Sequence, residues 1–245
     1  ETTVNYNRDV EIFPVHNTIF EKIYGESPYK SPTDMGVNMA GKCICDDEVC
    51  CEASKQEIIR RYYAALNSLV KGDSSDKEAQ KIELLMNMAG ITIADRKVAV
   101  KALERSKETN GPAAALELED GTIVTGKTTN LLGASAALLL NVLKHLAGLD
   151  HELHIISPES IEPIQKLKVD YLKSKNPRLH TDEVLIALSA SAANNPEARL
   201  ALSQLPKLEG CQAHTSVLLS DVDIKIFKKL GVQLTCEAVY EHAPL

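Results

Sequence analysis

Residues 116–125 read LELEDGTIVT, and this stretch decides the fold. Its first four residues alternate between leucine and glutamate, and a period of two is typical of a strand with one buried face. Asp120-Gly121 supplies the positive φ angles of a type I′ turn, and the four residues that follow are all β-branched. We therefore predict a β-hairpin at which a sheet begins.

The chain after the hairpin is predicted to alternate between helices and strands. A nearly all-apolar helix is expected over about 130–146, and a strand over 153–156 ends at Ser157-Pro158, where the next helix starts. Further helix starts are predicted at Thr181, Asn195 and Ser220, and further strands over 215–219 and 232–236. This order predicts a layered α/β sheet whose last βαβ unit is parallel and right-handed.

The chain before the hairpin is predicted to be an irregular start followed by helices. The expected features are a short helix over 15–23, a capping box from Ser54 to Glu57, a helix end at Gly72, and two more helix starts at Ser75 and Thr92. We thus predict an α/β protein with an N-terminal helical segment, 1–111, and an α/β sheet domain, 112–245.

Composition and charge exclude several classes of protein. The 245 residues are 44% hydrophobic, which is enough to bury a core, and 34 acidic against 27 basic residues leave a net charge of -7 that disfavours nucleic acid as a partner. No uninterrupted apolar run reaches the roughly 18 residues of a membrane span. The first five residues carry neither an initiator Met nor a signal, so we expect a cut end. Six cysteines in a chain of this size read as reduced thiols, which indicates a cytoplasmic location.

A phosphate-loop expression matches residues 121–128, GTIVTGKT. Four β-branched residues after Asp120-Gly121 favour an extended strand over a loop that curls around an anion. A weaker form of the idea concerns the helix start after Gly126, which has no acid in its first turn and so could bind a phosphate group. Its candidate ligand-binding residues are Lys127, Thr128, Thr129 and Asn130. The alternative is that Thr129 or Asn130 is an ordinary helix cap.

Other candidate site residues lie in polar loops and before a strand. The loop over 30–38 offers Lys30 and Asn38 for binding and Asp34 for catalysis, and the loop before Thr181 offers Lys175 and Asn176. His214 leads into a predicted strand whose end could face a cleft, which makes it the preferred catalytic histidine. Each of these loops has the plainer interpretation of a simple turn.

The cysteines and one fold analogy raise the question of a metal. Cys43, Cys45, Cys50 and Cys51 do not have the spacing of structural zinc ligands, so we favour small buried side chains and expect no metal. The hairpin, helix, strand and helix predicted over 116–173 follow the order of the cytidine-deaminase-like fold. The zinc-binding motifs of those enzymes are absent from 130–135 and 158–162.

Several blocks of the sequence resemble one family. They are 4–9 (VNYNRD), 29–38 (YKSPTDMGVN), 46–49 (DDEV), 52–62 (EASKQEIIRRY), 116–126 (LELEDGTIVTG) and 210–214 (GCQAH). The chain resembles the C-terminal half of the bacterial domain of unknown function 1846. The resemblance implies members about twice this length, an α/β fold, and a missing N-terminal half with a glycine-rich, nucleotide-loop-like segment. It implies no established activity.

Two hypotheses about function follow. The first is an uncharacterised half of an enzyme that binds a phosphorylated or nucleotide-like small molecule. The second is a non-catalytic half for packing or oligomerisation. The expected partner in either case is the missing N-terminal half of the same protein, and a homo-oligomer is left open.

Overall fold

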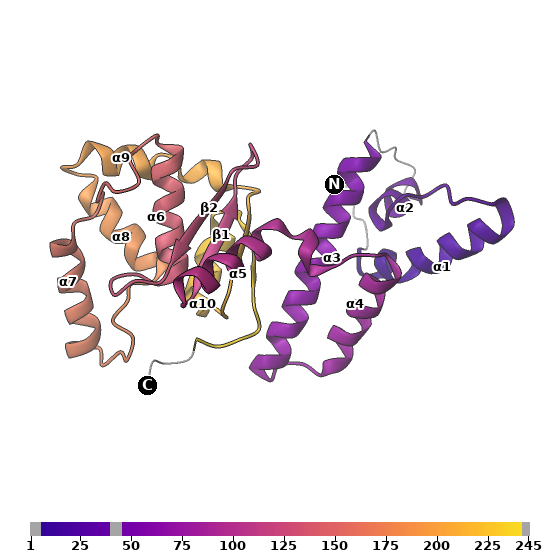
Figure 1. The fold of residues 1–245 in the computed structure, drawn as a ribbon, viewed down its shortest axis with the longest axis horizontal. Coiled ribbons are helices and arrows are strands. Elements are labelled where there is room, and N and C mark those ends of the chain that lie inside the picture. Colours follow the sequence, from indigo (N-terminus) through magenta and orange to yellow (C-terminus); the bar gives the residue numbers. More distant parts are fainter. Residues whose placement is uncertain (1–5, 40–45, 242–245) are drawn as a thin grey trace. The chain divides into compact units, whose positions relative to one another are not determined.

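A computed structural model of the chain describes residues 6–39 and 46–241, and it confirms a mixed α/β protein with a helical N-terminal part (Figure 1). The chain divides into two compact units, Glu1–Arg96 and Lys97–Leu245. The predicted division after residue 111 stays a prediction. Among the described residues, no helix combines the length and the apolar character needed to span a membrane.

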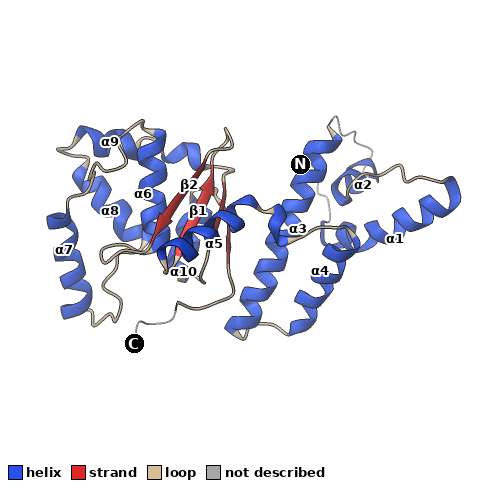
Figure 2. Ribbon diagram, in the orientation of Figure 1, coloured by secondary structure: helices blue, strands red, loops and turns tan. Residues whose placement is uncertain are grey.

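The first unit is built from helices around a small apolar core. Its elements are α1 (Tyr6–Tyr24), α2 (Pro32–Met39), α3 (Asp47–Lys71), α4 (Asp76–Met88) and the 3-10 turn η1 (Ile93–Asp95) (Figure 2). Its core consists of Val10, Ile58, Ile59, Tyr63, Met86 and Ile91. Since these side chains come from α1, α3, α4 and the residues just after α4, the core joins helices that are far apart in the sequence.

The ends of α3 show one error and one success of the sequence analysis. Asp46 is its N-cap, with Oδ1 accepting a hydrogen bond from the backbone N of Val49 at 2.9 Å, so the predicted capping box at Ser54 is wrong. Ser54 is buried inside the helix, and its hydroxyl hydrogen-bonds to that of Thr33 at 2.7 Å. The predicted end at Gly72 is confirmed, since this residue has the left-handed φ of 81°.

The second unit contains a four-stranded sheet of order β2-β1-β3-β4. Its strands are β1 (Ala113–Glu117), β2 (Ile123–Lys127), β3 (Gln212–Thr215) and β4 (Gln233–Cys236). β1 pairs antiparallel with both β2 and β3, whereas β3 and β4 are parallel and are joined by α10 (Asp221–Lys229). The predicted hairpin and the predicted parallel last pair are both confirmed.

Helices cover both faces of this sheet. Ala115 packs with Val98 and Ala102 of α5 (Lys97–Thr109), whereas Leu116 lies in the main core with Leu138 of α6 (Ala134–Leu146). Because neighbouring strand residues point to opposite faces, α5 and α6 lie on opposite sides. The remaining helical elements are α7 (Pro158–Lys166), η2 (Leu167–Tyr171), α8 (Thr181–Ser191), α9 (Pro196–Leu202) and η3 (Leu205–Leu208).

Gly126 of β2 lies directly under α6. A Cβ atom on this residue would be 2.2 Å from the backbone N of Leu138, so only glycine allows the strand and the helix to approach so closely. Residues 123–127 are a strand paired with β1, as the β-branched residues predicted. The glycine of the phosphate-loop expression is therefore required by packing.

The predicted helix start at Lys127–Asn130 is wrong. Lys127 is the last residue of β2, and α6 begins seven residues later at Ala134 with Gly133 as its N-cap. The segment between them is a loop in which the hydroxyl of Thr129 accepts hydrogen bonds from the backbone N of Leu131 and Leu132, at 3.2 and 3.0 Å. The loop closes on itself because Thr129 satisfies its backbone donors.

The predicted strand over 153–156 is also absent. Ile155 and Ile156 are buried in the main core, but the segment is a turn whose position is held by Lys144, which donates a hydrogen bond from Nζ to the carbonyl of His151. The cytidine-deaminase-like order is therefore not formed. The strand predicted over 215–219 lies instead at Gln212–Thr215.

Candidate functional site

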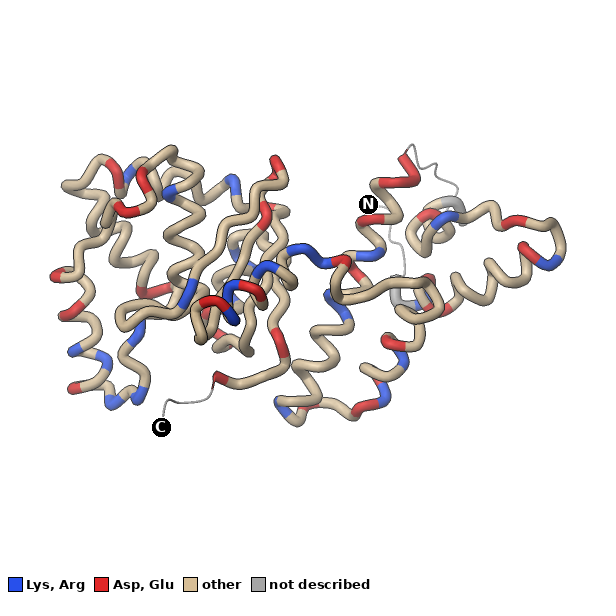
Figure 3. The backbone as a smooth tube through the Cα atoms, viewed as in Figure 1, with Lys and Arg blue, Asp and Glu red and all other residues tan. Residues whose placement is uncertain are grey.

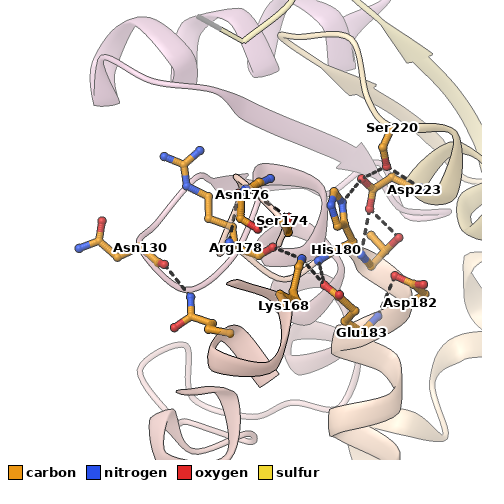
Figure 4. A network of polar contacts seen from close by, with 12 residues as sticks. Asn130, Lys168, Ser174, Asn176, Arg178, His180, Asp182, Glu183, Ser220 and Asp223 are labelled. Carbon is orange, nitrogen blue, oxygen red and sulfur yellow. Dashed lines mark hydrogen bonds and ion pairs between the residues drawn. The ribbon is translucent and has the colours of Figure 1, made fainter. Parts of the chain in front are cut away.

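The candidate site is a network of polar side chains around the start of α8 (Figure 4). Four segments contribute to it: the π-helical turn η2, the loop over 172–180, the first turn of α8 and the first turn of α10. Segments more than 40 residues apart in the sequence thus bring charged groups together.

Asp223 is the centre of this network. Its carboxylate is 3% exposed, and Oδ1 accepts hydrogen bonds from the backbone N and the hydroxyl of Thr181, at 2.9 and 2.8 Å. Its Oδ2 lies 2.7 Å from the hydroxyl of Ser220 and 3.0 Å from Nδ1 of His180. A buried carboxylate with four donors can stay ionised, because each donor replaces a lost contact with water.

The pKa values of the two charged partners move apart. Burial alone would raise the pKa of Asp223, but the hydrogen bonds from His180, Thr181 and Ser220 outweigh it and lower the pKa to about 2. The hydrogen bond with Asp223 raises the pKa of His180, and partial burial of the ring opposes this. The pair therefore favours a protonated imidazole next to an ionised carboxylate.

The ring of His180 is oriented by one nitrogen and accessible through the rest of its surface. Its side chain is 32% exposed, and in the described part of the chain Asp223 is the side chain that hydrogen-bonds to the ring. A neutral ring held through Nδ1–H leaves Nε2 as a proton acceptor, and the protonated ring can donate from Nε2. The arrangement suits proton transfer to or from a bound molecule.

A second charged pair fixes the backbone beside His180. Glu183 Oε2 accepts hydrogen bonds from the backbone N of His180 at 2.8 Å and from Nζ of Lys168 at 2.7 Å. Lys168 is buried and also donates to the carbonyl of Arg178 at 2.6 Å. The ammonium of Lys168 is thus used in holding the loop.

The predicted loops at 127–130 and 175–176 do come together in part. The backbone N of Leu179 donates to the carbonyl of Leu131 at 2.9 Å, which joins the loop before α6 to the loop before α8. Asn176 shapes the second loop, since its Oδ1 accepts from the backbone N of Arg178 at 3.1 Å. Asn130 contributes its backbone carbonyl, which accepts from Nε2 of Gln165 at 3.0 Å (Figure 4).

The other loop residues predicted for binding have simpler surroundings. Lys127 and Lys175 are exposed, and they form no ion pair with another described residue. Thr128 donates from its backbone N to the carbonyl of Pro112 at 2.9 Å. Acidic and basic residues are interspersed along the tube in Figure 3.

The predicted catalytic residues belong to different units. Asp34 lies in the first unit, where Oδ2 accepts from the backbone N of Lys30 at 2.7 Å and so helps to start α2. His214 lies in β3, with Nδ1 2.8 Å from the hydroxyl of Thr235 and Nε2 3.2 Å from Glu237. Its catalytic role stays a prediction, and its ring has no exposed surface through which it could meet a ligand.

Some predicted residues cannot be placed. The side chain of Asn38 and the whole of Cys43 and Cys45 lie outside the described residues. Cys50 is buried, and Cys51 donates from Sγ to the carbonyl of Lys30 at 3.3 Å. The described ranges, 6–39 and 46–241, contain no group of three or more side chains arranged to hold a metal ion.

The sequence analysis missed the central pair of the site. His180 and Asp223 are 43 residues apart, and no local motif connects them. The predicted cap at Ser220 is confirmed, since its hydroxyl accepts from the backbone N of Asp223 at 3.2 Å. The cap could be read from the sequence, but the second use of the Asp223 carboxylate needs the packing of α10 beside α8.

Comparisons with known proteins give a family but no activity. A family model described as domain of unknown function DUF1846, N-terminal, matches residues 1–90, and the C-terminal model matches 94–245. The UPF0371 protein cu0538 of Corynebacterium urealyticum is 58% identical over 96% of this chain and 48% of that protein. A UPF0371 protein of Streptococcus pneumoniae (strain JJA) is 52% identical over 99% of this chain and 49% of that protein. The chain spans about half the length of these curated relatives.

The match to both models corrects the resemblance inferred from the sequence. The family was right, but the restriction to a C-terminal half was wrong, because residues 1–90 match the N-terminal model. The prediction of a missing N-terminal half as the partner is contradicted for the same reason. The alternative function that depended on packing against that half is not carried forward.

Proposed function

Since the chain belongs to the DUF1846 family, a family of unknown function, we propose that His180 is the proton-transfer residue of an enzyme that acts on a phosphorylated or nucleotide-like small molecule. The observation that carries this proposal is the hydrogen bond between Nδ1 of His180 and the buried carboxylate of Asp223. A histidine oriented in this way can take up a proton at Nε2 and return it in a later step.

The charge around the site supports an anionic ligand. Lys175 lies in the loop before His180, and Lys127 ends the strand just before the loop that joins it. Both side chains are exposed and form no ion pair with another described residue, whereas Lys168 and Arg178 are paired with carboxylates. The exposed ammonium groups are therefore available to attract a phosphate group.

The proposal separates the roles of three residues. His180 moves the proton, Asp223 orients the ring and raises its pKa, and Lys175 attracts the phosphate. Asp223 is a positioning residue, because its carboxylate is buried and has four donors of its own.

The experiment that tests the proposal is a histidine-selective NMR titration of the full chain. The imidazole signals of His180, assigned with a His180→Gln variant, are followed against pH in the parent and in Asp223→Asn. The expected result is a pKa above the ordinary histidine value of about 6.5 in the parent and a lower pKa in the variant. Addition of inorganic phosphate, adenosine monophosphate or a sugar phosphate is expected to shift the Nε2 signal.

A Lys175→Ala variant completes the test, with the exposed Lys225→Ala on α10 as its matched control. The first substitution is expected to weaken the phosphate-dependent shift several-fold and the second to leave it unchanged. A His180 signal that no phosphorylated ligand moves, at concentrations up to tens of millimolar, would contradict the proposed function.

A further inference from the structure

A cavity of about 430 Å³ lies among the helices of the first unit, far in sequence from His180. It is lined by α1, the start of α2, the first half of α3 and the end of α4 with the residues just after it. This volume falls in the range of pockets that hold small molecules. The cavity is therefore large enough for a ligand of its own.

One side of the cavity is apolar. Phe13, Ile58, Leu85, Met88 and Ile91 line it, and of these Ile58 and Ile91 also belong to the core of the unit. These side chains are held by the packing of the helices, so the apolar wall exists before any ligand arrives. An aliphatic chain of several carbon atoms would lose contact with water by lying against it.

The cavity also has an acceptor without a donor. Oδ1 of Asn17 lines it from α1, is inaccessible to water, and has no hydrogen-bond partner among the described residues. A buried carbonyl oxygen left in this state costs about 1–3 kcal/mol, and a ligand N–H or O–H placed against it would remove that cost. This atom is an observation independent of the volume.

The charged groups of the cavity are mostly cationic. Lys30 and Lys55 line it, together with one acid, Glu21. Lys55 lies 3.1 Å from Glu52, but both side chains are at least a third exposed, so the pair is weak and can rearrange. A carboxylate at one end of a ligand would find two ammonium groups here.

From these three features we propose that the cavity binds a small N-acylated amino acid. The acyl chain lies against the apolar wall, the amide N–H donates to Oδ1 of Asn17, and the carboxylate pairs with Lys30 or Lys55. This site and the proton-transfer site at His180 belong to different units of the chain and are tested separately.

Isothermal titration calorimetry on the full chain tests this proposal with three matched ligands. N-hexanoylglycine has all three groups, N-hexanoylsarcosine lacks the amide N–H, and N-hexanoylglycinamide lacks the carboxylate. We expect N-hexanoylglycine to bind, and each of the other two to bind about tenfold more weakly, as the loss of one hydrogen bond or one ion pair implies. Equal affinity for the first two ligands, or no measurable heat with any of them, would refute the site.

Substitutions in the chain provide the second half of the test. Asn17→Leu removes the acceptor at nearly constant size, and Ala89→Leu, at the end of α4, fills the cavity. Both are expected to abolish measurable binding, whereas Asn87→Leu, which is exposed on the same helix and does not line the cavity, retains it. Retained binding in Ala89→Leu would overturn the location. If Asn17→Leu does not fold, the comparison of ligands with the parent chain still decides.

Discussion

The starts of α6 and α8 lie side by side and are built in opposite ways. At α6, Gly133 is the cap, and the next residues, Ala134 to Ala136, are small and buried. At α8, the cap is His180, and acidic side chains from α8 and α10 surround it. The loops before the two helices are joined by the pair Leu132 and Leu179.

The difference shows what an acid-free helix start means in this fold. The absence of acids before α6 predicted an open site for an anion, but the first turn of α6 is covered by packing. The chemically active groups gather at α8, where buried Asp223 supplies a charge. A helix start without acids is thus as consistent with burial as with binding.

The largest test of the contrast is Asp223→Ala. The substitution leaves the donors of His180, Thr181 and Ser220 without a partner in a buried place, which costs about 3–5 kcal/mol of unfolding free energy. Urea denaturation at pH 7 measures this. Asp182→Ala, in the same turn but half-buried, is the control and is expected to cost less than about 1 kcal/mol. Similar losses in both variants would mean that Asp223 is not the centre of the network.

The α6 side of the contrast is tested by Gly126→Ala. The new Cβ would overlap with the backbone of Leu138, so α6 must move, at a cost of about 3 kcal/mol. Gly133→Ala is the control, because its nearest neighbour would be 3.8 Å away, and we expect it to lose less than about 1 kcal/mol. Thermal unfolding followed by circular dichroism compares the two. A Gly126→Ala protein as stable as the control would show that the close approach is not required.

Acid sharpens the contrast further, through Asp223. The folded pKa of about 2 lies below the ordinary 3.8, so this group stabilises the fold above pH 4 by on the order of 2 kcal/mol, and the contribution is lost as pH falls from about 4 to 2. Urea denaturation of the parent and of Asp223→Asn at pH 7, 4 and 3 is expected to show the gap narrowing at low pH. A gap that stays constant would disprove an ionised Asp223.

The smallest expected effect concerns the loop before α6. Thr129→Val removes the hydroxyl that accepts from the backbone N of Leu131 and Leu132, and because water reaches this loop the cost is about 0.5–1 kcal/mol. Thr128→Val is the matched control, since the structure shows no hydrogen bond of its hydroxyl to another described residue. Guanidinium denaturation can resolve this difference, and equal stability of the two variants would leave the loop without its proposed support.

Local features of the fold could be predicted from the sequence, because their causes lie within a few residues. The hairpin turn at Asp120-Gly121, the end of α3 at Gly72, and the caps at Ser157, Asn195 and Ser220 are all of this kind. Each depends on one residue type that satisfies nearby backbone groups.

Features that depend on distant partners could not be predicted. The run over 153–156 has the composition of a strand, yet it is a turn, with two isoleucines buried against helices. The helix α6 starts later than predicted, because the loop before it pairs with Leu179. The pairing of His180 with Asp223 depends on how α8 and α10 pack. In each case tertiary packing decides among conformations that the local sequence allows.

The place of β3 in the sheet has a consequence for the order of folding. The hairpin of β1 and β2 joins neighbouring segments and can form early, but the backbone N of Ala113 hydrogen-bonds to the hydroxyl of Ser216, which is 103 residues away. During synthesis on the ribosome, the hairpin must therefore wait with one strand edge uncovered until nearly all of the second unit has emerged. That edge is the part of the nascent chain most exposed to aggregation, and the best place for a chaperone to act.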